Sequence, residues 1–231
     1  WGPRVSELLA AAGAEVPVVP YFGVAPGFVA EVPVLFMRLS FVGEFGYELV
    51  TSAEYGLRLW DLLYDAGRPL GIIPVGRGAI EGLRLEKGFR IYGRDMWSDH
   101  DPFAAGLAAF IDERKGHFIG RDGLERRREQ SMTHKLSCLA IEDPEFVMLG
   151  GEPVLDNTGR VAGFITSGAF GYSVGRSLAL AWIKSEYTRP GTPVLVQHFG
   201  LPLQAHVIAE PAFDPTNLRV RVGKVLATGD Q

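Results

Sequence analysis

Two glycines and two carboxylates meet in Ser40-Phe41-Val42-Gly43-Glu44-Phe45-Gly46-Tyr47-Glu48-Leu49, the stretch that decides the fold. Gly43 and Gly46 allow backbone conformations that a side chain would forbid, and they let a flat ligand approach the main chain. Glu48 lies in the apolar run 47–50, where a buried carboxylate needs a hydrogen-bonding partner. Such a carboxylate suits the N–H edge of a heterocycle. From the local pattern alone, a strand glutamate that faces solvent is the more frequent case.

The composition is that of a globular chain without a strong electrostatic bias. Its 231 residues suit one large domain or two small ones, and 47% hydrophobic with 22% charged residues can form a substantial core. A net charge of −4 gives no basic field for nucleic acid or anionic membranes, so we expect neither as a partner. No apolar run approaches the roughly 20 residues of a membrane span. The single cysteine, Cys138, excludes an internal disulfide and suits a strand core.

The first part of the chain mixes helices and strands. A short helix is expected at 6–12, and a strand at 32–42 has apolar residues on both sides, which predicts a central strand covered on both faces. Ser52 is a suitable N-cap for the next helix, and Gly67 is a suitable C-terminal stop. The apolar face of this helix comprises Tyr55, Leu59, Leu62, Leu63 and Ala66.

Two further helices are expected before residue 131. The helix at 76–87 places Glu81, Arg84 and Lys87 on one side, most simply as a salt-bridge network. The helix at 121–130 is dominated by charges, which is typical of a solvated helix. The inward face expected for the helix at 76–87 comprises Ala79, Ile80, Leu83 and Lys87.

Beyond Met132, short apolar runs alternate with turn sequences, which indicates an all-β barrel or sandwich. The polar stretch 129–133 separates this region from the first. We therefore expect an α+β chain with two domains, residues 1–130 and residues 131–231. The apolar runs are 135–140, 153–155, 161–166, 178–183, 193–197, 203–208 and 218–222.

Several stretches match familiar functional motifs but lack the spacing or the flanking structure that those motifs need. Residues 171–175 match the G-x-S-x-G elbow of serine hydrolases, yet a strand is expected at 177–183 where the elbow needs a helix. Residues 76–82 resemble a dinucleotide loop with the wrong spacing, so tight helix packing explains them better. The five histidines have no metal-ligand spacing with each other or with Cys138, and we predict no metal site.

Taken in order, the motifs resemble those of the folate-binding aminomethyltransferases, the family of the glycine cleavage T-protein. The family pattern Y-T-G-E-x-G-Y-E is matched at 41–48, G-x-G-A-R-D-x-L-R-L-E-x-G-x-x-L-Y-G at 76–93, and P-x-E-A-G-L at 102–107. In the second half, V-G-x-x-T-S-G is matched at 161–168 and A-L-A-x-V at 179–183. The resemblance spans essentially the whole chain. It looks closer to the C-terminal folate modules of sarcosine and dimethylglycine dehydrogenases and oxidases.

This resemblance implies an antiparallel-sheet folate-binding domain, N-terminally truncated here, followed by a β-barrel or jelly-roll domain. It implies tetrahydrofolate as cofactor and the transfer of one carbon from an amine substrate of the glycine, sarcosine or dimethylglycine type. Glu48 is implied to accept N–H bonds from the pterin, with Phe41 packed near its ring. The implied cofactor-binding residues are Glu48, Phe41, Gly43, Glu44, Gly46, Tyr47, Arg84 and Tyr92.

The same resemblance places the family's catalytic aspartate before residue 1. No catalytic residue is therefore expected in this chain, which alone is expected to be inactive. The implied partners are a carrier protein or an FAD-dependent oxidoreductase domain, with FAD confined to that separate domain. The implied location is the cytoplasm, or the mitochondrial matrix in a eukaryote.

Departures from the family pattern leave two alternatives open. Ile80 replaces the arginine of A-R-D, and Phe41 replaces the motif tyrosine. Ala104 replaces an acid and Ala109 an aromatic residue, which keeps open a degenerate scaffold without ligand. The other alternative is a folate-dependent factor for tRNA modification or iron–sulfur assembly, although its cysteine motif is absent from 87–95.

Overall fold

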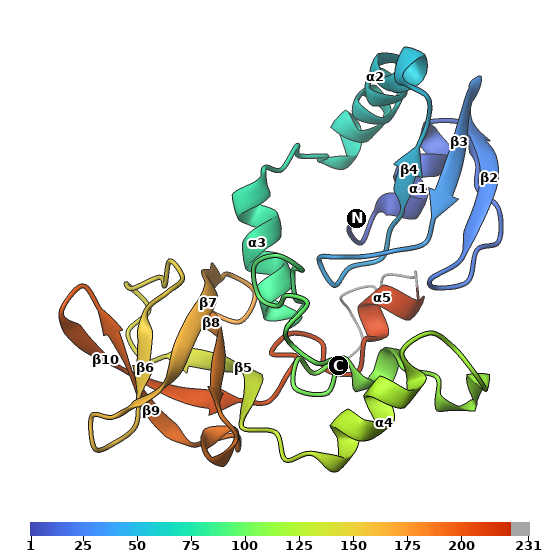
Figure 1. Ribbon diagram of the computed structural model, residues 1–231. Helices are drawn as coiled ribbons and strands as arrows, with labels where there is room; N and C mark the ends of the chain where they lie inside the picture. Colours follow the sequence, from blue (N-terminus) through green and yellow to red (C-terminus); the bar gives the residue numbers. More distant parts are fainter. Residues whose placement is uncertain (223–231) are drawn as a thin grey trace. The chain divides into compact units, whose positions relative to one another are not determined.

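The computed structural model describes residues 1–222, and the chain divides into two compact units. Unit 1 comprises residues 1–80 and the residues from 214 onward, and unit 2 comprises residues 81–213 (Figure 1). The expected domain boundary near residue 130 remains a prediction. No helix in the described part of the chain is long and apolar enough to cross a membrane.

Unit 1 is built on one antiparallel sheet with the strand order β1-β2-β3-β4 (Figure 1). Each strand pairs with its neighbours along the chain. The strands are β1 (Ala14–Glu15), β2 (Val24–Val29), β3 (Val32–Met37) and β4 (Glu48–Val50). The helices are α1 (Val5–Ala11), α2 (Gly56–Gly67) and α5 (Leu218–Val222), with 3-10 turns at Ala53–Tyr55 and Arg68–Leu70.

The sheet of unit 1 buries only one of its faces. Along β3, Val32, Val34 and Phe36 are buried in a cluster with apolar residues of α1 and α2. The prediction of a central strand is confirmed, because β3 pairs with both β2 and β4. The prediction that both faces are covered is wrong, because the second face lies open. This open face carries the exposed side chains of Val24, Phe28, Leu35 and Val50.

The helix after the glycine-rich stretch is confirmed, and α2 ends at Gly67 as expected, but the prediction of a cap at Ser52 is wrong. Ser52 makes no side-chain capping bond to the 3-10 turn that precedes α2. Gly67 keeps helical backbone with φ −82°, and the left-handed stop lies at Gly71, with φ 80°. Gly67 is required for another reason, since a Cβ there would lie 2.7 Å from Cβ of Ile72.

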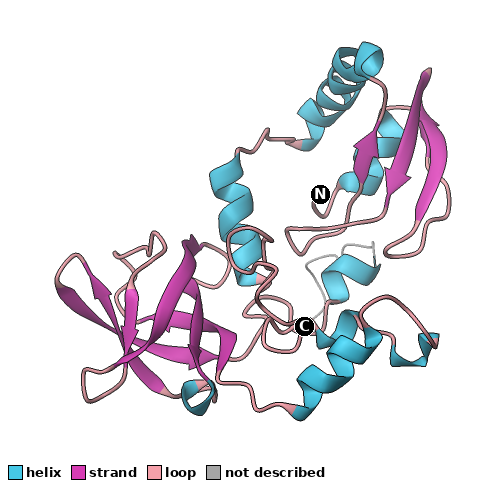
Figure 2. Cartoon of the chain, in the orientation of Figure 1, coloured by secondary structure: helices cyan, strands magenta, loops and turns pink. Residues whose placement is uncertain are grey.

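Unit 2 contains a closed antiparallel barrel, whose strands are drawn in magenta in Figure 2. Its strand order is β10-β5-β8-β7-β6-β9. Its core is an apolar cluster that includes Leu139, Ile165 and Val196. The strands are β5 (His134–Ile141), β6 (Pro153–Leu155), β7 (Val161–Gly171), β8 (Arg176–Lys184), β9 (Pro193–His198) and β10 (Leu201–Ile208).

One predicted strand is wrong, because residues 218–222 form helix α5 in unit 1. The barrel has no vacant edge for a further strand, since β10 pairs with β5 on one side and β9 on the other. The turn before α5 also favours a helix. The carboxylate of Asp214 accepts the backbone N–H of Leu218 and of Arg219, each at 3.1 Å.

Helices α3 (Arg77–Glu86) and α4 (Arg121–Glu129) lie where the sequence predicted them. The charged helix α4 has no buried residue, as expected. The inward face predicted for the helix at 76–87 is wrong in part: Lys87 is buried as expected, but Ala79 is exposed. The buried residues of α3 itself are Arg84, Leu85 and Glu86. Unit 2 also contains 3-10 turns at Ala108–Phe110, Glu113–Lys115 and Ser185–Tyr187.

Candidate functional site

Most of the glycine-rich stretch lies in the loop between β3 and β4, because the strand expected at 32–42 ends at Met37. Gly43 has φ 81°, in the left-handed region that favours glycine. Gly46 is needed for a different reason. A Cβ at Gly46 would lie 2.6 Å from Cδ1 and 2.7 Å from Cα of Trp1. The close approach that Gly46 permits is therefore that of Trp1, whose indole Nε1 donates to the carbonyl of Leu39 at 2.7 Å.

Glu48 begins β4 and pairs with Met37 across the β3–β4 ladder. Because side chains alternate along a strand, Glu48 shares the open face of the sheet with Leu35, Met37 and Val50. It is half-buried, and within residues 1–222 its carboxylate makes no hydrogen bond or ion pair. Both carboxylate oxygens can therefore accept bonds from a ligand that lies on an apolar surface.

The neighbours of Glu48 in the loop face different surroundings. Tyr47 packs edge-on against Phe36 and against Phe45, with ring centroids 5.6 Å apart in each case, on the buried side of the sheet. Glu44 pairs with Arg219 of α5 at 2.8 Å. Phe41 is half-buried in the same loop.

Arg38 is a residue of this site that the sequence did not single out. Its side chain is 4% exposed, and its guanidinium carbon lies 3.8 Å from the ring centroid of Phe45 and 5.6 Å from that of Tyr47. Nη2 donates to the carbonyl of Val220 at 2.9 Å. Burial lowers the pKa of the Arg38 guanidinium, and the phenols of Tyr47 and Tyr21 act in the opposite direction. The available signal was an arginine directly after an apolar strand.

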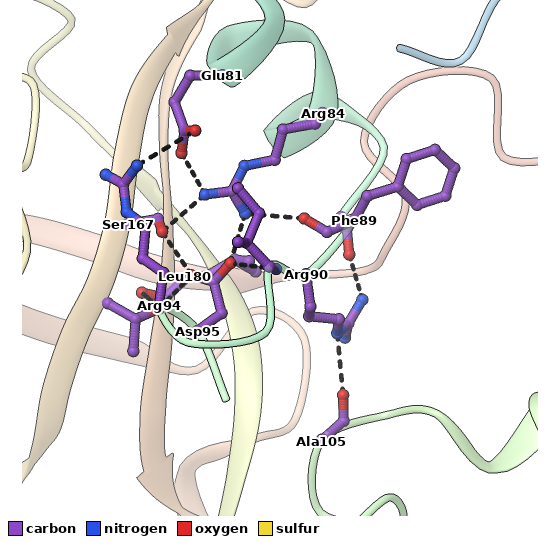
Figure 3. Close-up of polar contacts among 12 residues, drawn as sticks. Glu81, Arg84, Phe89, Arg90, Arg94, Asp95, Ala105, Ser167 and Leu180 are labelled. Atoms are coloured by element: carbon purple, nitrogen blue, oxygen red, sulfur yellow. Dashed lines mark hydrogen bonds and ion pairs between the residues drawn. The ribbon is translucent and has the colours of Figure 1, made fainter. Parts of the chain in front are cut away.

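Arg84 lies at the centre of a polar network inside unit 2 (Figure 3). It forms ion pairs with Glu81 and, at 2.7 Å, with Asp95. Its Nη2 also donates to the hydroxyl of Ser167 at 2.7 Å. The Arg84 side chain has no exposed surface, so it has no direct access to a ligand in this structure. The predicted salt-bridge network is confirmed for Glu81 and Arg84.

Tyr92 lies in a loop that this network holds. The carboxylate of Asp95 accepts the backbone N–H of Ile91 at 2.8 Å, and Gly93 donates to the carbonyl of Met96 at 2.8 Å. Tyr92 itself is 68% exposed. The structure thus brings most of the predicted residues into one loop of unit 1, whereas Arg84 and Tyr92 belong to unit 2.

The motifs that fitted poorly have structural explanations. Residues 171–175 connect β7 to β8, and no helix follows Ser173, so a hydrolase elbow is excluded. Glu86 instead accepts the backbone N–H of Ser173 at 2.6 Å. Tight packing is wrong for Gly76 and Gly78, whose Cβ atoms would meet nothing within 4 Å. At Gly82 an added Cβ would lie 3.2 Å from the carbonyl of Phe170.

A hollow of about 280 Å³ opens in unit 2, away from the predicted residues. His100 stacks on Trp182 in its wall, with ring centroids 4.1 Å apart, and the indole of Trp182 donates to the carbonyl of Asp95 at 2.7 Å. None of the predicted cofactor-binding residues lines this hollow.

Comparison with known protein families agrees with this architecture. The GCVT N-terminal domain matches residues 1–115, and the glycine cleavage T-protein C-terminal barrel domain matches residues 134–214. The crystal structure of glycine cleavage system aminomethyltransferase T from Bartonella henselae has a TM-score of 0.83 and 23% sequence identity. That match covers 93% of this chain and 58% of that chain. The expected antiparallel-sheet domain followed by a β-barrel is therefore confirmed.

Sequence relatives are of two kinds. The chain is 37% identical to 4-methylaminobutanoate oxidase (formaldehyde-forming) of Paenarthrobacter nicotinovorans, a match over 80% of this chain and 22% of the relative. It is 35% identical to mitochondrial dimethylglycine dehydrogenase of Homo sapiens, over 84% of this chain and 22% of the relative. It is 34% identical to the aminomethyltransferase of Rippkaea orientalis, over 94% of this chain and 58% of the relative. The chain thus spans under two thirds of each of these relatives.

Proposed function

Because the chain belongs to the aminomethyltransferase (glycine cleavage T-protein) family, we propose that it binds tetrahydrofolate and takes part in one-carbon transfer. The observation that carries this proposal is the Glu48 carboxylate. It is half-buried beside the apolar side chains of Leu35, Met37 and Val50, and within the described residues it has no partner. A buried carboxylate of this kind needs a donor, and a flat heterocycle with an N–H edge supplies two.

The residues present fit a pterin. The open face of β3 and β4 offers Leu35, Met37 and Val50 as an apolar surface for a ring, with Glu48 as the acceptor at the start of β4. Tetrahydrofolate, when bound, would supply the nitrogen atoms that take up the one-carbon unit. Glu48 would fix the orientation of the pterin through charge-assisted bonds, which are stronger than neutral ones.

The other candidate residues take different parts in this proposal. Gly43 gives the loop its turn, and Glu44 acts through its ion pair with Arg219. Arg84 acts indirectly, by holding the loop that carries Tyr92 through Asp95.

We further propose that the whole protein works in amine catabolism of the glycine, sarcosine or dimethylglycine type. The oxidase and dehydrogenase relatives support an amine substrate and an oxidoreductase partner domain. In this proposal FAD would be bound by that separate domain. We place the protein in the mitochondrial matrix where the source is eukaryotic, and in the cytoplasm otherwise; the name of the human relative, which is mitochondrial, supports the first of these. The two family matches support a domain boundary between residues 115 and 134.

Calorimetric titration with tetrahydrofolate under anaerobic conditions tests the proposal. We expect Glu48→Gln to weaken binding by about 1–3 kcal/mol, because a charged acceptor is lost. Glu15→Gln is the matched control, since Glu15 is an exposed strand glutamate in the same sheet and should leave binding unchanged. Absence of binding by the unaltered chain would contradict the proposal, and equal binding by Glu48→Gln would remove Glu48 from the site.

A further inference from the structure

The loop between β3 and β4 is held by a segment from the far end of the chain. Arg38 donates from Nη2 to the carbonyl of Val220 at 2.9 Å, and Arg219 pairs with Glu44 at 2.8 Å. Val220 is 1% exposed, so α5 also packs through an apolar side chain. All of these residues belong to unit 1. The two polar links run in opposite directions, one donated by the loop side and one by α5.

Arg38 is the more constrained of the two cations. It is 4% exposed, and within residues 1–222 it forms no ion pair with a carboxylate. A buried guanidinium must be compensated, and here the compensation comes from the ring of Phe45 at 3.8 Å and from main-chain carbonyls. One of these is the carbonyl of Gly46, at 3.5 Å. Arg38 thus contacts both the glycine loop and α5.

The position of Arg38 bears directly on the orientation of Glu48. Arg38 follows Met37, the residue that pairs with Glu48. Its guanidinium lies 5.6 Å from the ring of Tyr47, which is held edge-on by Phe36 on the buried side. Tyr47 directly precedes Glu48, the first residue of β4, and the Tyr47 ring lies on the buried side whereas Glu48 shares the open face with Met37. Fixing the Tyr47 ring on one face therefore fixes the direction of the Glu48 carboxylate on the other.

We propose that Arg38 is a positioning residue for the tetrahydrofolate site, which holds the Glu48 loop in its ligand-receiving form by clamping it to α5. This proposal rests on the proposed function. Because coupling between two equilibria is reciprocal, tetrahydrofolate must also strengthen the docking of α5. The segment at 214–222 is then part of the binding site without contacting the ligand.

Two measurements on the full 231-residue chain test this proposal. Hydrogen exchange without ligand follows the amides of residues 38–47 and 217–222 in Arg38→Met and Arg38→Lys. Calorimetry then follows tetrahydrofolate affinity in the same variants. The matched control is Arg58→Met, since Arg58 is an exposed arginine of unit 1 that pairs with Glu31. Circular dichroism checks that each variant is folded.

In Arg38→Met we expect exchange in both segments to be faster by about tenfold, and tetrahydrofolate affinity to fall by about tenfold, because a displaced acceptor binds poorly. Arg38→Lys keeps the positive charge but loses the planar guanidinium, so its exchange rates and its tetrahydrofolate affinity should lie between those of the unaltered chain and Arg38→Met. Arg58→Met should show neither effect. Tetrahydrofolate should slow exchange at 217–222 in the unaltered chain.

Unchanged exchange in both segments of a folded Arg38→Met would overturn the clamp. Faster exchange with unaltered affinity would overturn the positioning role and leave Arg38 as a structural residue. If Arg38→Met does not fold, the decision falls to Arg219→Gln and Arg38→Lys, and unaltered exchange in both would overturn the proposal. Failure of the proposed function is recognised separately, because then the unaltered chain binds no tetrahydrofolate while the exchange measurement still decides the clamp.

Discussion

Nη1 of Arg84 lies 2.7 Å from Oδ2 of Asp95, and neither side chain has any exposed surface. The same carboxylate accepts bonds from the hydroxyls of Thr166, at 2.7 Å, and Ser167, at 2.5 Å, so the pair links α3 to β7. Breaking a buried ion pair by removing one partner leaves the other charge buried and uncompensated. Unit 2 therefore depends on this pair more than on the ion pairs of its exposed helix α4.

Asp95→Asn is expected to lower the free energy of unfolding by about 3 kcal/mol, because Arg84 loses its fully buried counter-ion and keeps only the partly buried Glu81. Urea unfolding measures the change. Asp99→Asn is the matched control, since the side chain of Asp99 is 80% exposed and its removal should have little effect. Equal stabilities of the two variants would contradict a structural role for the Arg84–Asp95 pair.

Gly46→Ala is expected to destabilise unit 1 by about 1–3 kcal/mol, since overpacking forces neighbours to move. The added Cβ would lie 2.7 Å from Cα of Trp1, which is main chain and cannot rotate away. Gly56→Ala is the control, because a Cβ there meets nothing within 4 Å and Gly56 has helical backbone. Alanine at that helical position should be neutral or stabilising. Thermal unfolding of both variants measures the change in stability. If Gly46→Ala lost no more stability than Gly56→Ala, the close approach of Trp1 to Gly46 would be contradicted.

The stability of the barrel is expected to fall in acid partly through Glu152. Burial raises the pKa of this carboxyl, but the N–H groups of Leu149, at 2.7 Å, and Gly150, at 2.8 Å, together with His198, hold it below its ordinary value. A carboxyl with a lowered folded pKa stabilises above its unfolded pKa, about 4.3, and loses that contribution as the pH falls through the folded pKa. Glu152→Gln should therefore flatten the pH dependence of unfolding below about pH 4.3, as measured by urea titrations at several pH values. An unaltered slope would show that Glu152 contributes nothing.

Cys138 is expected to be inert in the folded protein. Its side chain lies in the barrel wall with 1% exposure, and burial raises the pKa of its thiol, with a smaller effect of the same sign from Glu210. Because the thiolate is the reactive form, a thiol reagent should modify Cys138 only after unfolding. Labelling followed with and without denaturant checks this. Modification in native buffer at the denatured rate would contradict the buried position.

Much of the fold followed from hydrophobic periodicity and turn residues. The barrel strands from residue 134 to residue 208 were predicted because short apolar runs were separated by turns. Residues 218–222 have the same alternation but form a helix. Two facts outside the segment decide this: the barrel edges are already paired, and Asp214 accepts the N–H groups at the start of α5. Neither fact is visible in a local window.

Only part of the candidate site was predicted, because a local window of sequence does not show contacts between remote residues. Glu48 stood out because it follows a glycine turn in an apolar run, and its open-face position is consistent with the expected acceptor. Arg38 and the true partner of Gly46 were missed. Their contacts with Val220 and Trp1 join residues that are remote in the sequence, and no local pattern encodes such pairs.

The return of residues 214–222 to unit 1 has a consequence for biosynthesis. During translation the whole of unit 2 emerges before α5, so the barrel can close while unit 1 still lacks α5. The loop that carries Glu48 is made before unit 2 but completed after it, since Arg219 and Val220 follow unit 2 in the sequence. A nascent chain arrested before residue 214 would carry a finished barrel and an unclamped ligand loop.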